Sequence, residues 1–265
     1  MSPRAETIDR TNNPPRRRWS AFRILCLLLS VGLTSTASSQ VILHPSLGLQ
    51  TFAFTGEALA AQPMAPVDDR ARPLGGGLEG GQFGMRLQLE VMSDEDAILR
   101  FPVSLEYFEL NGKSTFGISS RRAIRKQRIT FTHDASIISA NIGATAAFFD
   151  ERKLYISGEL KGVYLQPTNL YTRIYFADND STIRDVEVEP FDGAFRIGGF
   201  LRAGAQLPFF DPFLLDFSVG VGAVNLFLKE SDPELQQNLL VIEQRPAEEG
   251  TLRYFSIGMS VIWKL

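Results

Sequence analysis

The chain has little of what builds a disulfide-rich, thiol-dependent or metal-binding protein. Its 265 residues include one cysteine, Cys26, and two histidines, His44 and His133. Cys26 lies inside a short apolar run near the N-terminus, so removal of that run would leave no thiol for disulfides or catalysis. Two distant histidines and scattered acids give no cluster with metal-ligand spacing. We therefore expect no metal and no cofactor.

Long hydrophobic runs are also missing. A membrane-spanning helix needs roughly 18 or more apolar residues, and the longest run here, residues 24–33, is too short for that. The run follows four arginines and precedes small residues at 34–39. This order of basic, apolar and small segments is typical of a secretion signal, with an uncleaved anchor as the alternative. We expect residues 1–39 to be a cleaved signal peptide and residues 40–265 to form one domain.

A surplus of positive charge is absent as well. The formal net charge of the whole chain is −3, with 27 Lys and Arg against 30 Asp and Glu. Residues 1–39 hold six of the arginines and two of the acids, so the remainder carries about −7. Such a balance gives no support to nucleic-acid binding.

The feature that is present is alternation, and it is clearest in the last twelve residues. In residues 254–265, Phe255, Ile257, Met259, Val261 and Trp263 share one face, and small or polar residues occupy most of the other. Side chains of a strand point alternately to opposite faces. One thoroughly apolar face on a free strand would invite aggregation. The wall of a barrel in lipid is built with this pattern, its polar face turned to the lumen.

Seven further segments repeat this alternation, which brings the number of predicted strands to eight. Each is long enough to cross a bilayer as a tilted strand of about 9–11 residues. The segments are 41–54, 82–92, 98–110, 135–149, 153–165, 194–209 and 213–227.

The connections between these segments alternate between long and short. The short ones, at 93–97, 150–152 and 210–212, are polar or contain Asp or Pro, as tight turns prefer. The long ones are roughly 55–81, 111–134, 166–193 and 229–250, and the Pro- and Gly-rich first of them is expected to be disordered. Outer-membrane barrels combine short periplasmic turns with longer outer loops.

We therefore predict an all-β fold: an eight-stranded antiparallel transmembrane up-and-down β-barrel of the cell outer membrane, with short periplasmic turns and long extracellular loops. The alternative is a soluble barrel or sandwich, which would place its charges outside. The polar face here is rich in Gly and Ser and too sparse in charge for a solvated surface.

The polar face carries five basic and four acidic residues. Hypothesis: these charges pair in a lumenal network that plugs the barrel, because eight strands leave an interior just wide enough for side chains. The alternative is a narrow polar pore. The nine residues are Arg86, Glu90, Arg100, Glu106, Glu159, Lys161, Arg196, Arg202 and Asp216.

In this architecture and in its terminal strand, residues 41–265 resemble small bacterial outer-membrane barrel proteins of the OmpA/OmpX/OmpW type. More narrowly they resemble the outer membrane protein beta-barrel domain family of Bacteroidetes-like bacteria. In that family the last strand carries a signal for the barrel-assembly machinery. The resemblance assigns this signal to Ser256, Gly258, Val261 and Trp263, although the family often ends on an aromatic residue and this chain ends on Leu265.

Some barrels of this kind resemble lipid A-modifying enzymes that use a His, a Ser and a carboxylate near the outer rim. The one comparable constellation is His133, Asp134 and Ser136. Such triads are defined by geometry and not by adjacency in sequence. We interpret these residues as part of a rim loop and expect no enzyme.

One predicted outer loop is strongly basic, and loops on a rigid scaffold commonly carry function. We expect this loop to contact lipopolysaccharide phosphates or to pair with the acidic loops, an ordinary solvated loop being the alternative. The functions left open are a structural, adhesion or surface-interaction barrel, which the filled lumen favours, and a narrow channel or small hydrophobic-solute transporter. We expect a monomer whose partners are membrane lipid, lipopolysaccharide and, during insertion, the assembly machinery. The basic residues are Lys113, Arg121, Arg122, Arg125, Lys126 and Arg128.

Overall fold

A computed structural model describes most of the chain after residue 40. The described residues are 41–55, 59–66, 73–94, 97–119, 126–148, 153–176, 181–191, 193–230, 239–241 and 249–265. The predicted signal peptide, 1–39, lies outside them. Within this part of the chain no helix is long and apolar enough to cross a membrane.

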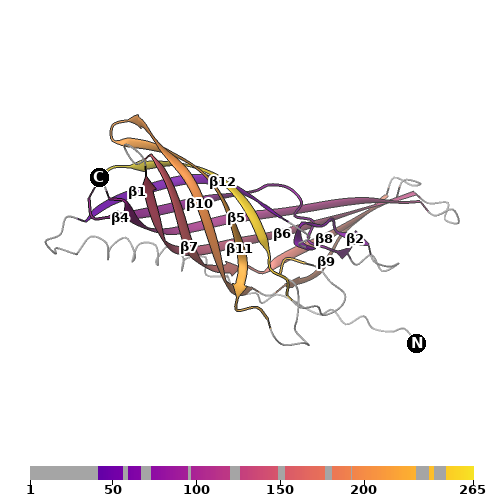
Figure 1. The fold of residues 1–265 in the computed structure, drawn as a ribbon. Coiled ribbons are helices and arrows are strands. Elements are labelled where there is room, and N and C mark those ends of the chain that lie inside the picture. Colours follow the sequence, from indigo (N-terminus) through magenta and orange to yellow (C-terminus); the bar gives the residue numbers. More distant parts are fainter. Residues whose placement is uncertain are drawn as a thin grey trace, which may run out of the picture. The chain divides into compact units, whose positions relative to one another are not determined.

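Eight antiparallel strands form a closed ring, which confirms the predicted fold (Figure 1). Their order around the ring is β5-β4-β1-β12-β11-β10-β7-β6, and β6 pairs again with β5. The last strand closes the barrel against the first, with Leu47 opposite Val261. The eight are β1 (Ile42–Phe54), β4 (Gln82–Met92), β5 (Leu99–Ser119), β6 (Lys126–Phe148), β7 (Leu154–Leu165), β10 (Ala194–Phe210), β11 (Phe213–Phe227) and β12 (Arg253–Trp263).

The strand register places side chains of the same kind next to one another around the wall. Leu49 lies opposite Met259 of β12 on one side and Met85 of β4 on the other. All three are exposed on the outside, with exposed fractions of 63%, 49% and 53%. The neighbouring inward positions, such as Gln50 and Arg86, are buried. The period of two in the sequence therefore becomes one apolar outer face and one buried inner face.

The predicted loop over 111–134 is wrong in extent, because β5 and β6 remain paired from Leu110 opposite Ala135 out to Ser119 opposite Lys126. Within the predicted loop 166–193 the chain forms two paired strands, β8 (Thr168–Phe176) and β9 (Ser181–Phe191). β8 pairs with the outer part of β6, from Asp134 outward, so β5, β6, β8 and β9 make one projecting sheet. Figure 1 shows this sheet extending from the barrel on the side away from the C-terminus. Beyond the barrel wall, the outward face of β5 becomes polar although strand pairing continues. A strand prediction that requires one apolar face therefore fails there.

The first long connection is not the disordered loop expected, at least in its described parts. It forms a 3-10 turn, η1 (Leu59–Ala61), and two short paired strands, β2 (Ala65–Pro66) and β3 (Pro73–Leu74). Ala60, Met64 and Leu78 have no exposed surface. The segment therefore packs over one end of the barrel, here called the mouth. The C-terminus and the strand ends that flank the three predicted short connections lie at the opposite end, here called the short-turn end.

Candidate functional site

Arg86 of β4 is the centre of the charged interior. Its Nη1 donates to Oε1 of Glu106 at 2.7 Å, and its Nη2 donates to Oε1 of Glu159 at 2.8 Å. Gln88 accepts from the same guanidinium at 2.7 and 3.0 Å. Arg202 lies 3.1 Å from the Glu159 carboxylate and also donates to Gln88. Strands on opposite sides of the ring are thereby joined across the lumen.

Two further cations complete this network. Lys161 donates to Oε2 of Glu106 at 2.6 Å, and Ser139 donates to the same oxygen. Nearer the short-turn end, Arg100 lies 3.4 Å from Glu90 and donates to Gln206 at 2.8 Å. Eight of the nine predicted charged residues, all except Arg196, are therefore buried, none more than 6% exposed. Four positive and four negative side chains balance in a space from which water is largely excluded.

Arg196 does not join this network. It lies near the mouth, where it donates to the Glu249 carboxylate through Nε and Nη2 at 2.7 to 3.0 Å. Asn225 and the amide of Glu230 donate to the same carboxylate. Burial raises the pKa of Glu249, but these donors and the Arg196 charge together hold it below its usual range. The sequence did not reveal this partner, because Glu249 lies in a predicted loop without periodicity.

The half of the interior nearer the mouth is apolar, a feature that was not predicted from the sequence. Aromatic and aliphatic side chains from the inner face pack with residues of the long connections above the charged layer. The signal was present in the sequence, since Phe52 and Phe54 continue the inward phase of Ser46 and Gln50. The cluster includes Phe52, Phe54, Phe108, Leu110, Ile137, Val163, Phe200, Tyr254, Ala60, Leu78 and Leu240.

Large inward rings lie against glycines of neighbouring strands. A Cβ on Gly220 would collide with the Phe200 ring, and a Cβ on Gly222 would lie 2.7 Å from Cζ of Tyr254. Phe200 and Tyr254 stack with their centroids 5.7 Å apart. Lys161 lies 4.6 Å from the Phe200 ring centre, within cation–π range. The glycines thus make room for the rings that separate the charged layer from the mouth.

The structure does not assemble the candidate constellation at 133–136. His133 has no exposed surface, and its Nδ1 lies 2.9 Å from the Gly76 carbonyl oxygen. Ser136 is an odd number of residues away and so points to the other face of β6, where its hydroxyl donates to Gln166 at 2.6 Å. Burial lowers the pKa of His133, an effect that the Gly76 carbonyl and Asp134 offset only in part. His133 is a neutral anchor for the segment over the mouth.

The residues assigned to the assembly signal all lie on β12. Ser256 is buried on the inner face beside Gly258, whereas Val261 and Trp263 are 42% and 48% exposed on the outer wall. Their role stays a prediction. Trp263 ends a chain of ring contacts at the short-turn end, formed by Phe209, Phe210, Phe213 and Trp263 with centroids 4.7 to 6.1 Å apart.

The six predicted basic residues are divided between strands and undescribed chain. Lys113 of β5 and Arg128 of β6 are exposed on the projecting sheet, and Lys126 is the first residue of β6. Arg121, Arg122 and Arg125 lie outside the described residues. Lys113 and Arg128 share a face with Tyr171, Arg173 and Tyr175 of β8, because Thr132 pairs with Lys113 and Tyr171, and Arg128 with Tyr175.

No protein-family model matches the sequence, and no curated protein does. Solved structures with some likeness include Neisserial surface protein A, at 10% identity over 85% of this chain and 97% of that one, with a TM-score of 0.37. Another is Ail, the attachment invasion locus protein of Yersinia pestis, in complex with the heparin analogue sucrose octasulfate. It matches at 10% identity over 85% and 99% of the two chains, with a TM-score of 0.37. The translocator domain of the autotransporter NalP from Neisseria meningitidis is at 9% identity over 92% and 95%, with a TM-score of 0.23. Identities and TM-scores this low carry no role over to this chain.

Proposed function

We propose that the protein is a closed β-barrel of the bacterial outer membrane that displays its projecting sheet as an interaction surface and catalyses no reaction. The observation that carries this proposal is the inversion of polarity across the wall. The outer face is apolar and exposed on every strand of the ring, while the charges are buried inside. A soluble barrel would have the reverse arrangement.

The extent of the apolar wall supports insertion into lipid. Soluble monomers rarely expose contiguous apolar patches larger than a few hundred square ångströms. Here each of the eight strands carries an apolar side chain that is at least 49% exposed. Examples, one per strand, are Leu47, Met85, Phe101, Ile142, Leu160, Leu201, Val221 and Ile257. The ring cluster that ends at Trp263 fits an interfacial aromatic girdle.

The filled interior favours a closed barrel over a channel. An aqueous pathway would have to pass the paired charges around Arg86 and then the apolar cluster around Phe52 and Tyr254. The filled interior therefore argues against both a narrow channel and a hydrophobic-solute transporter. The proposed orientation places the short-turn end in the periplasm and the mouth outside the cell.

The projecting sheet is the proposed site of contact with partners. Lys113, Arg128 and Arg173 are exposed on one face, interspersed with Tyr171 and Tyr175. A flat face of cations and phenol rings suits phosphate groups on sugars, through charge-assisted hydrogen bonds and ring contacts. We propose lipopolysaccharide as the partner, a monomer as the working form, and recognition of β12 by the assembly machinery during insertion. Membership of the barrel family of Bacteroidetes-like bacteria is part of this proposal.

Planar-bilayer recording of the purified protein tests closure. We expect no stable conductance from protein whose insertion is verified by vesicle flotation and heat-modifiable migration. A steady single-channel conductance would overturn the closed barrel and favour the channel.

A lipopolysaccharide-binding measurement tests the surface. Lys113→Glu is expected to weaken binding, whereas Lys153→Glu, the same charge change at the short-turn end, is expected to leave binding unchanged. Equal binding by both variants and the parent protein would remove this face from the proposal.

A further inference from the structure

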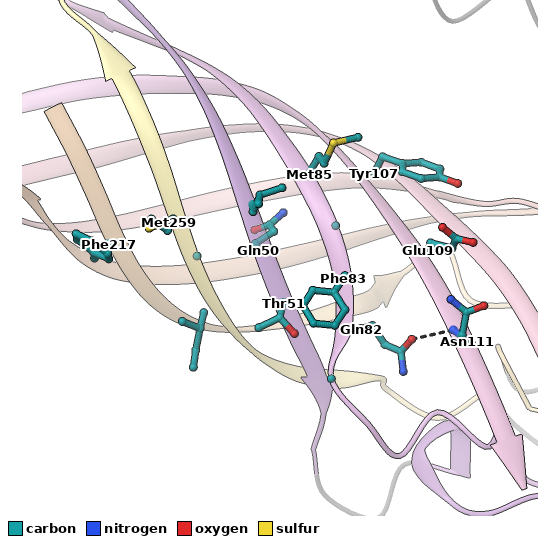
Figure 2. Close-up of a pocket in the computed structure, with 15 residues that line it drawn as sticks. Gln50, Thr51, Gln82, Phe83, Met85, Tyr107, Glu109, Asn111, Phe217 and Met259 are labelled. Atoms are coloured by element: carbon teal, nitrogen blue, oxygen red, sulfur yellow. Dashed lines mark hydrogen bonds between the residues drawn. The ribbon is translucent and has the colours of Figure 1, made fainter. Parts of the chain in front are cut away.

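The outer wall carries a groove of about 700 Å³ across β11, β12, β1, β4 and β5 (Figure 2). One ring of paired residues forms its apolar part: Phe217, Met259, Leu49, Met85 and Tyr107 lie side by side on consecutive strands. The volume lies within the range of about 300–1,000 Å³ that is common for sites of small organic ligands. In the proposed membrane this groove would open toward acyl chains.

The next ring of residues toward the mouth adds polar groups to the groove. There Ile257, Thr51, Phe83 and Glu109 are paired in sequence across β12, β1, β4 and β5. Figure 2 shows Thr51, Phe83 and Glu109 at this level. Glu109 is the charged residue among those that line the groove. Its paired neighbour Phe83 is 75% exposed, so Glu109 lies in the same row of the wall as an exposed apolar side chain.

A carboxyl side chain in the same row as apolar wall residues calls for a partner. Charged groups on a lipid-facing wall are costly and commonly mark a binding site. The side chain of Gln82, which also lines the groove, does not fill this role. The Gln82 side chain accepts from the amide of Asn111 and donates to the Gly80 carbonyl. The nearest basic residue on the same face of β5, Lys113, is four residues farther out, about 13 Å along a strand.

We propose that the groove binds one membrane lipid whose headgroup carries a primary amine. The acyl chain lies along Met259, Leu49 and Met85, and the ammonium group pairs with Glu109 beside the Thr51 hydroxyl. Charge selects this occupant, because none of the described residues that line the groove is a cation that could receive a purely anionic headgroup. The inference rests on the proposed insertion into the outer membrane.

Native mass spectrometry of protein extracted from vesicles of equal phosphatidylethanolamine and phosphatidylglycerol tests the proposal. We expect one retained lipid per barrel, with phosphatidylethanolamine preferred about fivefold, as for one ion pair near a surface. Glu109→Gln should abolish the preference. Glu79→Gln, which removes an exposed carboxylate that does not line the groove, should preserve it. Thr51→Trp should fill the groove and abolish retention of either lipid.

Four results would overturn the proposal: a preference that survives Glu109→Gln, equal retention of the two lipids, a preference for phosphatidylglycerol, or a dimer that covers the groove. Vesicle flotation, measured in parallel, separates this inference from the proposed function. Protein that floats with vesicles but shows no preference overturns the lipid site alone. Protein that does not float overturns the proposed function and the lipid site with it.

Discussion

At the scale of single residues, the interior depends on charges that have no access to bulk water. Glu106 is the central acceptor, because its two carboxylate oxygens accept hydrogen bonds from Arg86, Lys161 and Ser139. Burying two charges is costly, and their mutual attraction offsets that cost only while both partners remain. The network therefore stabilises the barrel only as a complete set.

Glu106→Gln should destabilise the folded barrel by about 3–5 kcal/mol, because it leaves Lys161 without its buried counter-charge and leaves Arg86 with Glu159 alone. Denaturant unfolding in lipid vesicles measures the change. The double variant Glu106→Gln with Lys161→Met restores the balance of charge and should recover part of the loss. An unfolding midpoint unaffected by Glu106→Gln would contradict the network.

Gly220→Ala should cost about 1–3 kcal/mol, because the added methyl group meets the Phe200 ring in a filled interior. Gly158→Ala is the matched control. Its Cβ would make ordinary contact with Leu201 at 3.6 Å, so its effect should stay within about 0.5 kcal/mol. Thermal unfolding of both variants gives the comparison, and equal losses would show that ring packing is not the cause.

At the scale of elements, strands β5 and β6 serve two structures at once. Their short-turn halves close the ring, and their outer halves carry the projecting sheet, where β8 replaces β7 as the neighbour of β6. The segment over the mouth is held to this sheet by the Ser114 hydroxyl, which accepts from the Met64 amide, and by His133. One polar side chain on β5 and one on β6 thus hold the segment over the mouth in place.

Acid should weaken the attachment of the segment over the mouth, because His133 holds it. Burial places its folded-state pKa below the unfolded value of about 6.5, so the unfolded form binds more protons as pH falls. The stability contributed by neutral His133 is therefore full above about pH 6.5 and declines below it. The protection factors of the Gly76, Gly77 and Leu78 amides, which donate to carbonyls of residues 59–62, should fall in acid by more than they do in His133→Gln. The same pH dependence in both proteins would contradict this role.

At the scale of the whole molecule, the sequence was sufficient to predict the ring of eight strands. Strand number, strand phase and most boundaries could be predicted, because a wall in lipid must repeat one apolar face every second residue. β4 and β11 match their predicted limits. The eight central charges could be placed inside for the same reason.

What escaped prediction lies where that periodic constraint ends. In the proposed orientation the outer halves of β5 and β6 extend beyond the lipid, and their outward faces are polar. Lys113 and Arg128 therefore looked like loop residues, although their backbones are paired. The partnership of Arg196 with Glu249 joins residues 53 apart in the chain through a segment with no regular pattern. The apolar layer around Phe52 could not be predicted, because the sequence does not show how much of the inner face the charged side chains fill.

The central claim is that the apolar face of the ring lies in lipid while the charged face lies inside. A cysteine scan along β10 tests this most directly, because residues 40–265 contain no cysteine of their own. Single cysteines at positions 201 to 206, labelled with a fluorophore in vesicles, are exposed to quenchers attached to lipid acyl chains. We predict strong quenching at Leu201, Ala203 and Ala205, and weak quenching at Arg202, Gly204 and Gln206. Uniform quenching, or quenching with the opposite phase, would contradict the membrane barrel.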